Sequence, residues 1–135
     1  MANALYPLGR SAFLRAEIDW VGDDVTVALL DGSYTYDPAH DFASDLTGVL
    51  ATAALTGKAV LADGIADADD VSVSGVGLGD TVERVVFYKD TGTAATSALI
   101  YYADENDDTT AISRPGDGGA IVLMFSNSST RCFRI

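Results

Sequence analysis

Val85-Val86-Phe87-Tyr88 and Ile121-Val122-Leu123-Met124-Phe125 are apolar at every position, and these two stretches decide the fold class. Short runs rich in valine, isoleucine and aromatic residues favour β-strands. Val71-Ser72-Val73-Ser74 alternates instead, which places its valines on one side of a strand and its serines on the other. A strand that is apolar on both sides lies centrally in a sheet, or another subunit covers its outer face. The sequence therefore predicts a mainly β protein and gives a first indication of assembly.

Segments of this kind follow one another along the chain, and turn sequences such as Asp31-Gly32-Ser33 and Asp90-Thr91-Gly92 separate them. Strands are expected at Val25–Leu30, Val49–Ala53, Lys58–Ala62, Val71–Val76, Glu83–Tyr88, Ala98–Tyr102, Ile121–Phe125 and Thr130–Arg134. The stretch from Tyr34 to Leu46 predicts a long ordered loop with one helical turn at Asp41 to Leu46. About eight strands at this spacing predict an antiparallel β-sandwich, jelly-roll or immunoglobulin-like, as one domain over residues 1–135.

An N-terminal arm and a short helix are expected within residues 1–20. Pro7 suits the first position of the helix, and Phe13, Leu14 and Ile18 would give it a narrow apolar face. This amphipathic pattern predicts a helix that packs against the β body with its polar side in water.

The two ends of this region have different expected roles. The helix should end near Asp19, after which Trp20 anchors the chain onto the core. The arm is uncharged and too short to pack alone. We therefore expect its residues to contact a partner: Ala2, Asn3, Ala4, Leu5 and Tyr6.

The composition excludes several function classes. Hydrophobic residues make up 48% of the 135 residues, which is enough for a packed core. The 20 acidic and 8 basic residues give a net charge of −12, so a nucleic acid would be repelled. No apolar run reaches the length of a membrane span, and the start lacks the pattern of a secretory signal. We expect synthesis in a cytoplasm, without a membrane step.

Candidate catalytic and metal-binding residues are few. His40 is the only histidine and Cys132 the only cysteine, so the common nucleophile–base pairs and a thiolate zinc site are not expected. Ser74 to Gly79 is glycine-rich without a nucleotide-binding fingerprint and predicts a flexible turn. Asp104 to Asp108 and Asp67 to Asp70 are interpreted as solvated acidic turns rather than calcium loops. The sequence predicts no enzymatic activity, no catalytic residue, no cofactor and no bound metal.

Short motifs follow one another in order along almost the whole chain. They are Met1-Ala2-Asn3-Ala4-Leu5-Tyr6-Pro7, Gly9-Arg10, Phe13-Leu14, Ile18-Asp19-Trp20, Val27-Ala28-Leu29-Leu30, Ser33-Tyr34-Thr35, His40-Asp41-Phe42, Ser44-Asp45, Asp63-Gly64-Ile65-Ala66-Asp67-Ala68-Asp69-Asp70-Val71, Tyr88-Lys89-Asp90-Thr91-Gly92-Thr93, Ser97-Ala98-Leu99-Ile100, Gly118-Gly119-Ala120-Ile121 and Phe133-Arg134-Ile135. Together they resemble a family of small virion structural proteins of tailed bacteriophages. The segment from Asn127 to Cys132 departs from that family, in which a shorter asparagine-glycine turn is typical. The resemblance implies a virion component without enzymatic activity.

Three functions follow as hypotheses. The leading one is a capsid decoration (cement) protein on the outer shell, made in the host cytoplasm. Its partners would be the major capsid protein or other virion proteins and its own copies, in a homo-oligomer such as a trimer. The second is a structural protein of the tail, neck or a fibre. The third is a carbohydrate-binding module that uses Trp20, Tyr34 and Tyr36, with calcium at Asp104 to Asp108.

Overall fold

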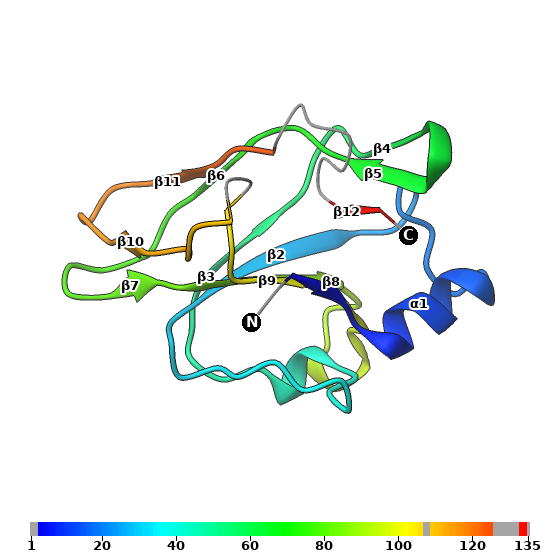
Figure 1. Cartoon of the computed structure of the whole chain (residues 1–135), viewed down its shortest axis with the longest axis horizontal. Helices are drawn as coiled ribbons and strands as arrows, with labels where there is room; N and C mark the ends of the chain where they lie inside the picture. The colour runs from blue at the N-terminus through cyan, green and yellow to red at the C-terminus, as the bar shows by residue number, and fades with distance from the viewer. Residues whose placement is uncertain (1–2, 107–108, 126–132, 135) are drawn as a thin grey trace.

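The largest element of the structure is a sheet of five antiparallel strands, seen in a computed structural model that describes residues 3–106, 109–125 and 133–134 (Figure 1). Its order is β1-β9-β8-β2-β3, and its strands are β1 (Ala4–Leu5), β2 (Val25–Leu30), β3 (Val49–Ala54), β8 (Arg84–Lys89) and β9 (Leu99–Ala103). Every residue of β2 is buried, because neighbouring strands pair with both of its edges and core side chains cover both of its faces. β8, which contains one of the two runs that are apolar on both sides, likewise lies inside the sheet, between β9 and β2.

Three smaller antiparallel ladders lie over one face of this sheet (Figure 1). They are β12-β5-β4, with β4 (Ala59–Leu61), β5 (Ile65–Asp67) and β12 (Phe133–Arg134), then β11-β6, with β6 (Val71–Val73) and β11 (Ile121–Leu123), and β10-β7, with β7 (Thr81–Val82) and β10 (Arg114–Pro115). Their buried Ala66, Val73 and Val82 belong to the same core cluster as Val27 and Leu29 of β2. The protein is thus mainly β and antiparallel, with a second layer made of separate ladders.

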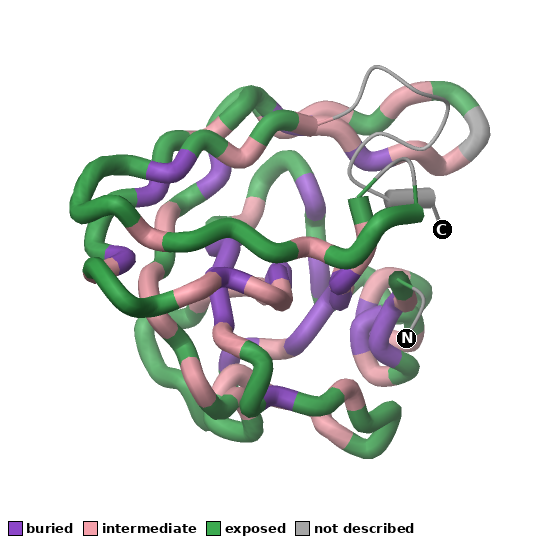
Figure 2. Tube along the Cα trace, turned by 60° about the vertical axis from the view of Figure 1, so that its left-hand side comes forward, coloured by how far each residue is buried: buried purple, intermediate pink, exposed green. Residues whose placement is uncertain are grey.

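The other face of the sheet carries a second core, which is rich in tyrosine. Tyr6, Tyr34 and Tyr102 pack there against Leu30 and Val86 from the two central strands. The loop that follows β2 covers this face and contains the 3-10 turn η1 (Ala43–Asp45), where the sequence predicted a helical turn. Two further 3-10 turns are η2 (Ala62–Gly64) and η3 (Ala94–Thr96). Figure 2 shows the buried stretches inside the described chain and the exposed ones in the loops around it.

Helix α1 (Pro7–Leu14) begins at the expected proline but ends earlier than predicted. Ala16 adopts a left-handed conformation with φ of 59°, which a right-handed helix cannot contain. The expected end near Asp19 is therefore wrong. Within the described residues, no helix is long and apolar enough to cross a membrane.

The buried face of α1 also differs from the prediction. Leu14 is 88% exposed, whereas the small residues Gly9 and Ala12 are buried. A Cβ on Gly9 would lie 2.5 Å from the Leu99 carbonyl oxygen, so only glycine lets the helix approach β9 this closely. The helix packs through small side chains and Phe13, as predicted for Phe13, whereas Leu14 takes no part in this contact.

The strand predictions agree with the structure where the apolar runs are long. β2 has the predicted bounds, and β3, β4, β8 and β9 lie within one or two residues of theirs. β6 and β11 are shorter than expected, and four short strands were missed: β1, β5, β7 and β10. Of the strand predicted at Thr130–Arg134, only Phe133–Arg134 falls within the described residues.

Candidate interaction surface

The N-terminal segment, predicted to contact a partner, is part of the sheet. Ala4 pairs with Tyr102 and Leu5 pairs with Tyr101 across the β1–β9 ladder. Leu5 is 8% exposed and Tyr6 is fully buried, so their side chains fill this chain's own cores. Contact with a partner through residues 2–6 stays a prediction, and within the described chain only Asn3 and Ala4 offer side-chain surface for it; Ala2 lies outside the described residues.

Hydrogen bonds of two side chains, Asn3 and Tyr36, hold β1 in place. The Asn3 Oδ1 accepts hydrogen bonds from the backbone N–H groups of Asp104 (2.9 Å) and Glu105 (3.1 Å), and its amide donates to the Glu105 carbonyl at 3.2 Å. Tyr36 donates from its hydroxyl to the Leu5 carbonyl at 3.4 Å, and its ring lies 5.1 Å from that of Tyr6. The Leu5 carbonyl, which points away from β9, is therefore already bonded within the chain, and in this sense the β1 edge is closed.

The outer edge of β3 is open by comparison. The backbone N–H of Leu55 donates to Val25 at 2.8 Å, and Ala53 pairs with Val27. Because inward and outward hydrogen-bonding groups alternate in an antiparallel ladder, the backbone groups of Thr52 and Ala54 point away from β2. Both residues are exposed, and no strand of the described chain pairs with this edge.

Seven large apolar side chains are exposed among the described residues: Leu14, Val21, Val49, Val60, Leu78, Val122 and Met124. Two of them come from the stretch that the sequence showed to be apolar on both sides. β11 pairs with β6 and lies outside the main sheet, so its Ile121 faces the core while Val122 and Met124 are 58% and 75% exposed. A central position is thus excluded for this strand, and its outer face has no cover within the described chain.

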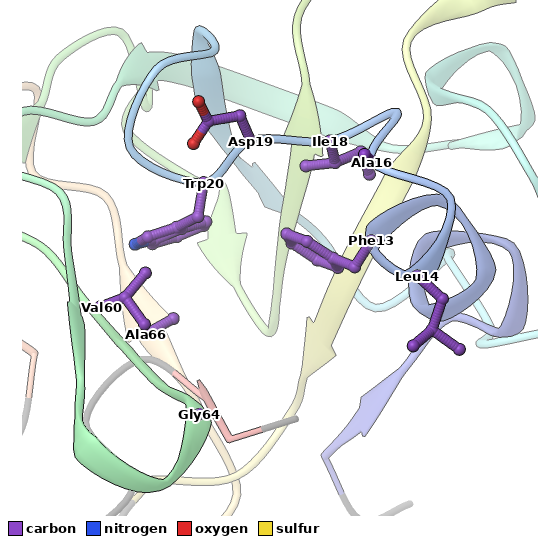
Figure 3. Close-up of a pocket in the computed structure, with 9 residues that line it drawn as sticks. All are labelled: Phe13, Leu14, Ala16, Ile18, Asp19, Trp20, Val60, Gly64 and Ala66. Carbon is purple, nitrogen blue, oxygen red and sulfur yellow. The ribbon is translucent and has the colours of Figure 1, made fainter.

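Two apolar hollows lie at opposite ends of the second layer. One of about 620 Å³, shown in Figure 3, is lined by Phe13, Leu14, Ala16, Ile18, Asp19, Trp20, Val60, Gly64 and Ala66. The other, of about 440 Å³, is lined by Leu29, Val82, Val85, Asn106, Ile112, Arg114, Ala120, Ile121, Val122, Leu123 and Met124. Each hollow holds one charged side chain, Asp19 or Arg114. Among the described residues, neither hollow thus brings together a pair of groups for acid–base catalysis.

A hydrogen-bonded chain of phenols connects His40 to the tyrosine core. The hydroxyls of Tyr6 and Tyr34 lie 2.7 Å apart, and that of Tyr34 lies 3.0 Å from the His40 Nδ1. Tyr102 donates from its hydroxyl to the Asp104 carboxylate at 3.0 Å. Burial raises the pKa of Tyr6 and of Tyr34, and burial together with the Asp104 hydrogen bond raises the pKa of Tyr102. These tyrosines stay neutral and hold the loop on the sheet.

Several carboxylates act as turn caps. The Asp45 carboxylate accepts hydrogen bonds from the backbone N–H groups of Asp41 (2.9 Å) and Phe42 (3.1 Å), which lower its pKa. Hydrogen bonds from the Ser33 side chain and backbone likewise lower the pKa of Asp31. Both carboxylates are ionised and face water. In the turn at Asp104 to Asp108, by contrast, Asp104 is only 7% exposed, so the interpretation of this turn as solvated is wrong for that residue.

The residues proposed for sugar binding are not displayed on the surface. Trp20 is 4% exposed, and its indole N–H donates to the Asp67 carbonyl at 3.1 Å; Tyr34 is 1% exposed. Neither ring can stack on a sugar, and Tyr36 is half-buried over β1. The anchoring of Trp20 in the core is as predicted.

The other sequence candidates are dispersed over the molecule. Ser74 to Gly79 forms the turn between β6 and β7, with Gly75 and Gly79 at positive φ. Within the described chain, no group of three or more histidine, cysteine or acidic side chains could hold a metal ion. Two residues of the turn at Asp104 to Asp108, Asp107 and Asp108, lie outside the described residues, as does the segment from Asn127 to Cys132.

Comparison with known proteins adds no family. No protein-family model matches the chain, and no curated protein matches it. A function is therefore proposed from the exposed apolar surface at β11 and from the sequence resemblance.

Proposed function

We propose that this protein is a non-enzymatic structural component of a tailed-bacteriophage virion, and that it decorates the outer capsid shell. The observation that carries the proposal is the apolar surface at β11, which the described chain leaves uncovered: Val122 in the strand and Met124 just after it are exposed on a body with a net charge of −12. Exposed apolar side chains on an otherwise charged surface are typical of a protein contact. The motifs that resemble phage virion proteins supply the setting.

The rest of the molecule suits such a role. Two packed cores make the body rigid, and turn-capping carboxylates keep its exterior ionised and soluble. The partners we propose are the major capsid protein or other virion proteins, and further copies of this chain. We further propose that the two layers correspond to a jelly-roll or immunoglobulin-like sandwich whose second sheet is divided into ladders.

A position on the tail, neck or a fibre is the second candidate, because the same contact surface would serve there. Quantitative mass spectrometry of purified virions separates the two positions. Hundreds of copies per particle support decoration, and a dozen or fewer support the tail or neck. Burial of Trp20 and Tyr34 argues against the third candidate, a carbohydrate-binding module, because two of its three aromatic residues are not accessible to a sugar.

Shell binding can be tested with the β11 surface directly. Val122→Asp places a charge on the proposed contact, and Thr35→Asp places the same charge on an exposed loop residue as a matched control. Purified capsids that lack the protein are mixed with each variant and sedimented. We expect the wild type and Thr35→Asp to sediment with the shell and to raise its resistance to heat, and Val122→Asp to stay in the supernatant. Equal behaviour of both variants would contradict the role of β11, and no binding by the wild type would contradict the function.

A further inference from the structure

The outer edge of β3 is a second exposed surface, distinct from β11, and no strand of the described chain pairs with it. Unpaired edge strands bind other extended strands, and many proteins block them with charged residues or proline. No charged residue and no proline lies between Asp45 and Lys58, so β3 has neither block. The outward-facing Thr52 and Ala54 also have small, exposed side chains that let another backbone approach.

The available length of this edge is short and defined. Val49 pairs with Leu30 and Ala51 with Leu29, which leaves Leu50 as an extra residue in a β-bulge. The regular part of the edge is therefore Ala51–Ala54. It offers the N–H and C=O groups of Thr52 and Ala54, which are enough for about four hydrogen bonds to one neighbouring strand.

Charge favours a second copy as that neighbour. Copies of a chain with a net charge of −12 repel each other wherever their acidic surfaces meet. An uncharged strand set against the same uncharged strand brings no like charges together at the contact itself. It also offers no charge that would attract a basic or acidic segment of another protein.

We propose that two copies of this chain pair through β3 about a two-fold axis, in antiparallel register. The axis passes beside Ala53, so that Thr52 of each copy lies opposite Ala54 of the other and the two five-stranded sheets become one continuous sheet. The same patch on both subunits closes the contact at two copies, and a dimer follows instead of the expected trimer. This pairing does not depend on the virion proposal.

Sedimentation of the purified full-length chain from micromolar to millimolar concentration tests the pairing. We expect a reversible change in mass from 14.1 kDa to twice that value. Ala54→Lys places two like charges across the axis and should weaken dimerisation at least tenfold. Ala95→Lys makes the same change at an exposed residue of η3, outside the sheet, and should leave dimerisation unchanged.

A second variant guards against indirect effects. Thr52→Pro removes an N–H that points away from β2, so it deletes a bond of the dimer without deleting one of the β2–β3 ladder. A native circular dichroism spectrum with a monomeric mass supports the pairing. A wild type that stays monomeric, a trimer, or a dimer that survives both Ala54→Lys and Thr52→Pro overturns it. Dimers that fail to bind capsids would uphold the pairing while contradicting the virion proposal.

Discussion

The strands β1 and β3 form the two edges of one sheet, yet the chain treats these edges differently. At β1, the Tyr36 hydroxyl reaches the Leu5 carbonyl, and Asn3 is bonded to the backbone of Asp104 and Glu105. At β3, the backbone groups of Thr52 and Ala54 face outward, and no described strand pairs with them. Covering an edge with side chains prevents uncontrolled pairing, whereas an edge left open is available for a specific partner. This difference favours the β3 edge over the β1 edge as the place where another copy would pair.

Removing the ring that underlies the closed edge should have the largest effect. Tyr6 is fully buried and packs against Tyr36, so Tyr6→Ala leaves a cavity and a disordered β1 edge. We expect a loss of about 3–5 kcal/mol in the free energy of unfolding, measured by denaturant titration. Leu14→Ala is the control, because Leu14 is 88% exposed and its truncation should cost less than about 0.5 kcal/mol. Equal losses would show that the packing over β1 is unimportant.

The tyrosine core that closes β1 should also make the protein sensitive to alkali. The pKa values of Tyr6, Tyr34 and Tyr102 are raised by burial, so these hydroxyls stay protonated in the folded state. Above about pH 10 they ionise only in the unfolded chain, so the free energy of unfolding falls as the pH rises. Tyr6→Phe removes one such group and should make the fall shallower by about 1.4 kcal/mol per pH unit. The free energy of unfolding is measured by denaturant titration at a series of alkaline pH values. Identical slopes against pH for the wild type and Tyr6→Phe would contradict a Tyr6 that stays protonated in the folded state.

The hydrogen bonds of the Asn3 side chain are expected to contribute less to the free energy of unfolding. Asn3→Ala removes three hydrogen bonds from an exposed side chain beside β1 to the backbone of Asp104 and Glu105, so we expect a loss of about 1 kcal/mol. Asn3→Asp keeps the oxygen that accepts from Asp104 and Glu105 and should retain part of the stability. If both variants unfold like the wild type, the hydrogen bonds of the Asn3 side chain do not stabilise this edge of the sheet.

The smallest effect is expected at the open edge. Ala54 is exposed in the monomer, so Ala54→Lys should change the free energy of unfolding by less than about 0.5 kcal/mol in dilute solution. The same kind of change on the closed edge, Leu5→Lys, buries a charge and should cost several kcal/mol. Comparable destabilisation by the two lysines, measured by thermal unfolding, would contradict the asymmetry of the edges.

The sequence predicted the parts of the fold that continuous apolar runs determine. β2 and β8 could be located because strands buried on both faces are apolar at successive positions. The pattern could not locate β1, since two residues become a strand only through pairing with β9. The end of α1 was missed for a similar reason, because Ala16 adopts a left-handed conformation without the glycine that usually signals one.

The candidate surface was predicted only in part. For the apolar run at β11 the sequence left two alternatives, a central strand or an outer face covered by another subunit. The structure excludes the central strand. The N-terminal arm was expected to contact a partner, and nothing local in the sequence shows that the distant Tyr36 and Tyr102 pack with Tyr6 in one core. The open edge of β3 was missed, because strand order in a sheet is a property of the tertiary fold.

Amide hydrogen exchange by NMR, followed as a function of protein concentration, tests the contrast between the two edges most directly. In dilute solution the N–H groups of Thr52 and Ala54 should exchange fast, while that of Ala53, which faces β2, stays protected. Raising the concentration should slow exchange at Thr52 and Ala54 and leave the β1 amides unchanged. Protection of Thr52 and Ala54 that is already complete in dilute solution, or that never changes with concentration, would contradict an open and self-pairing β3 edge.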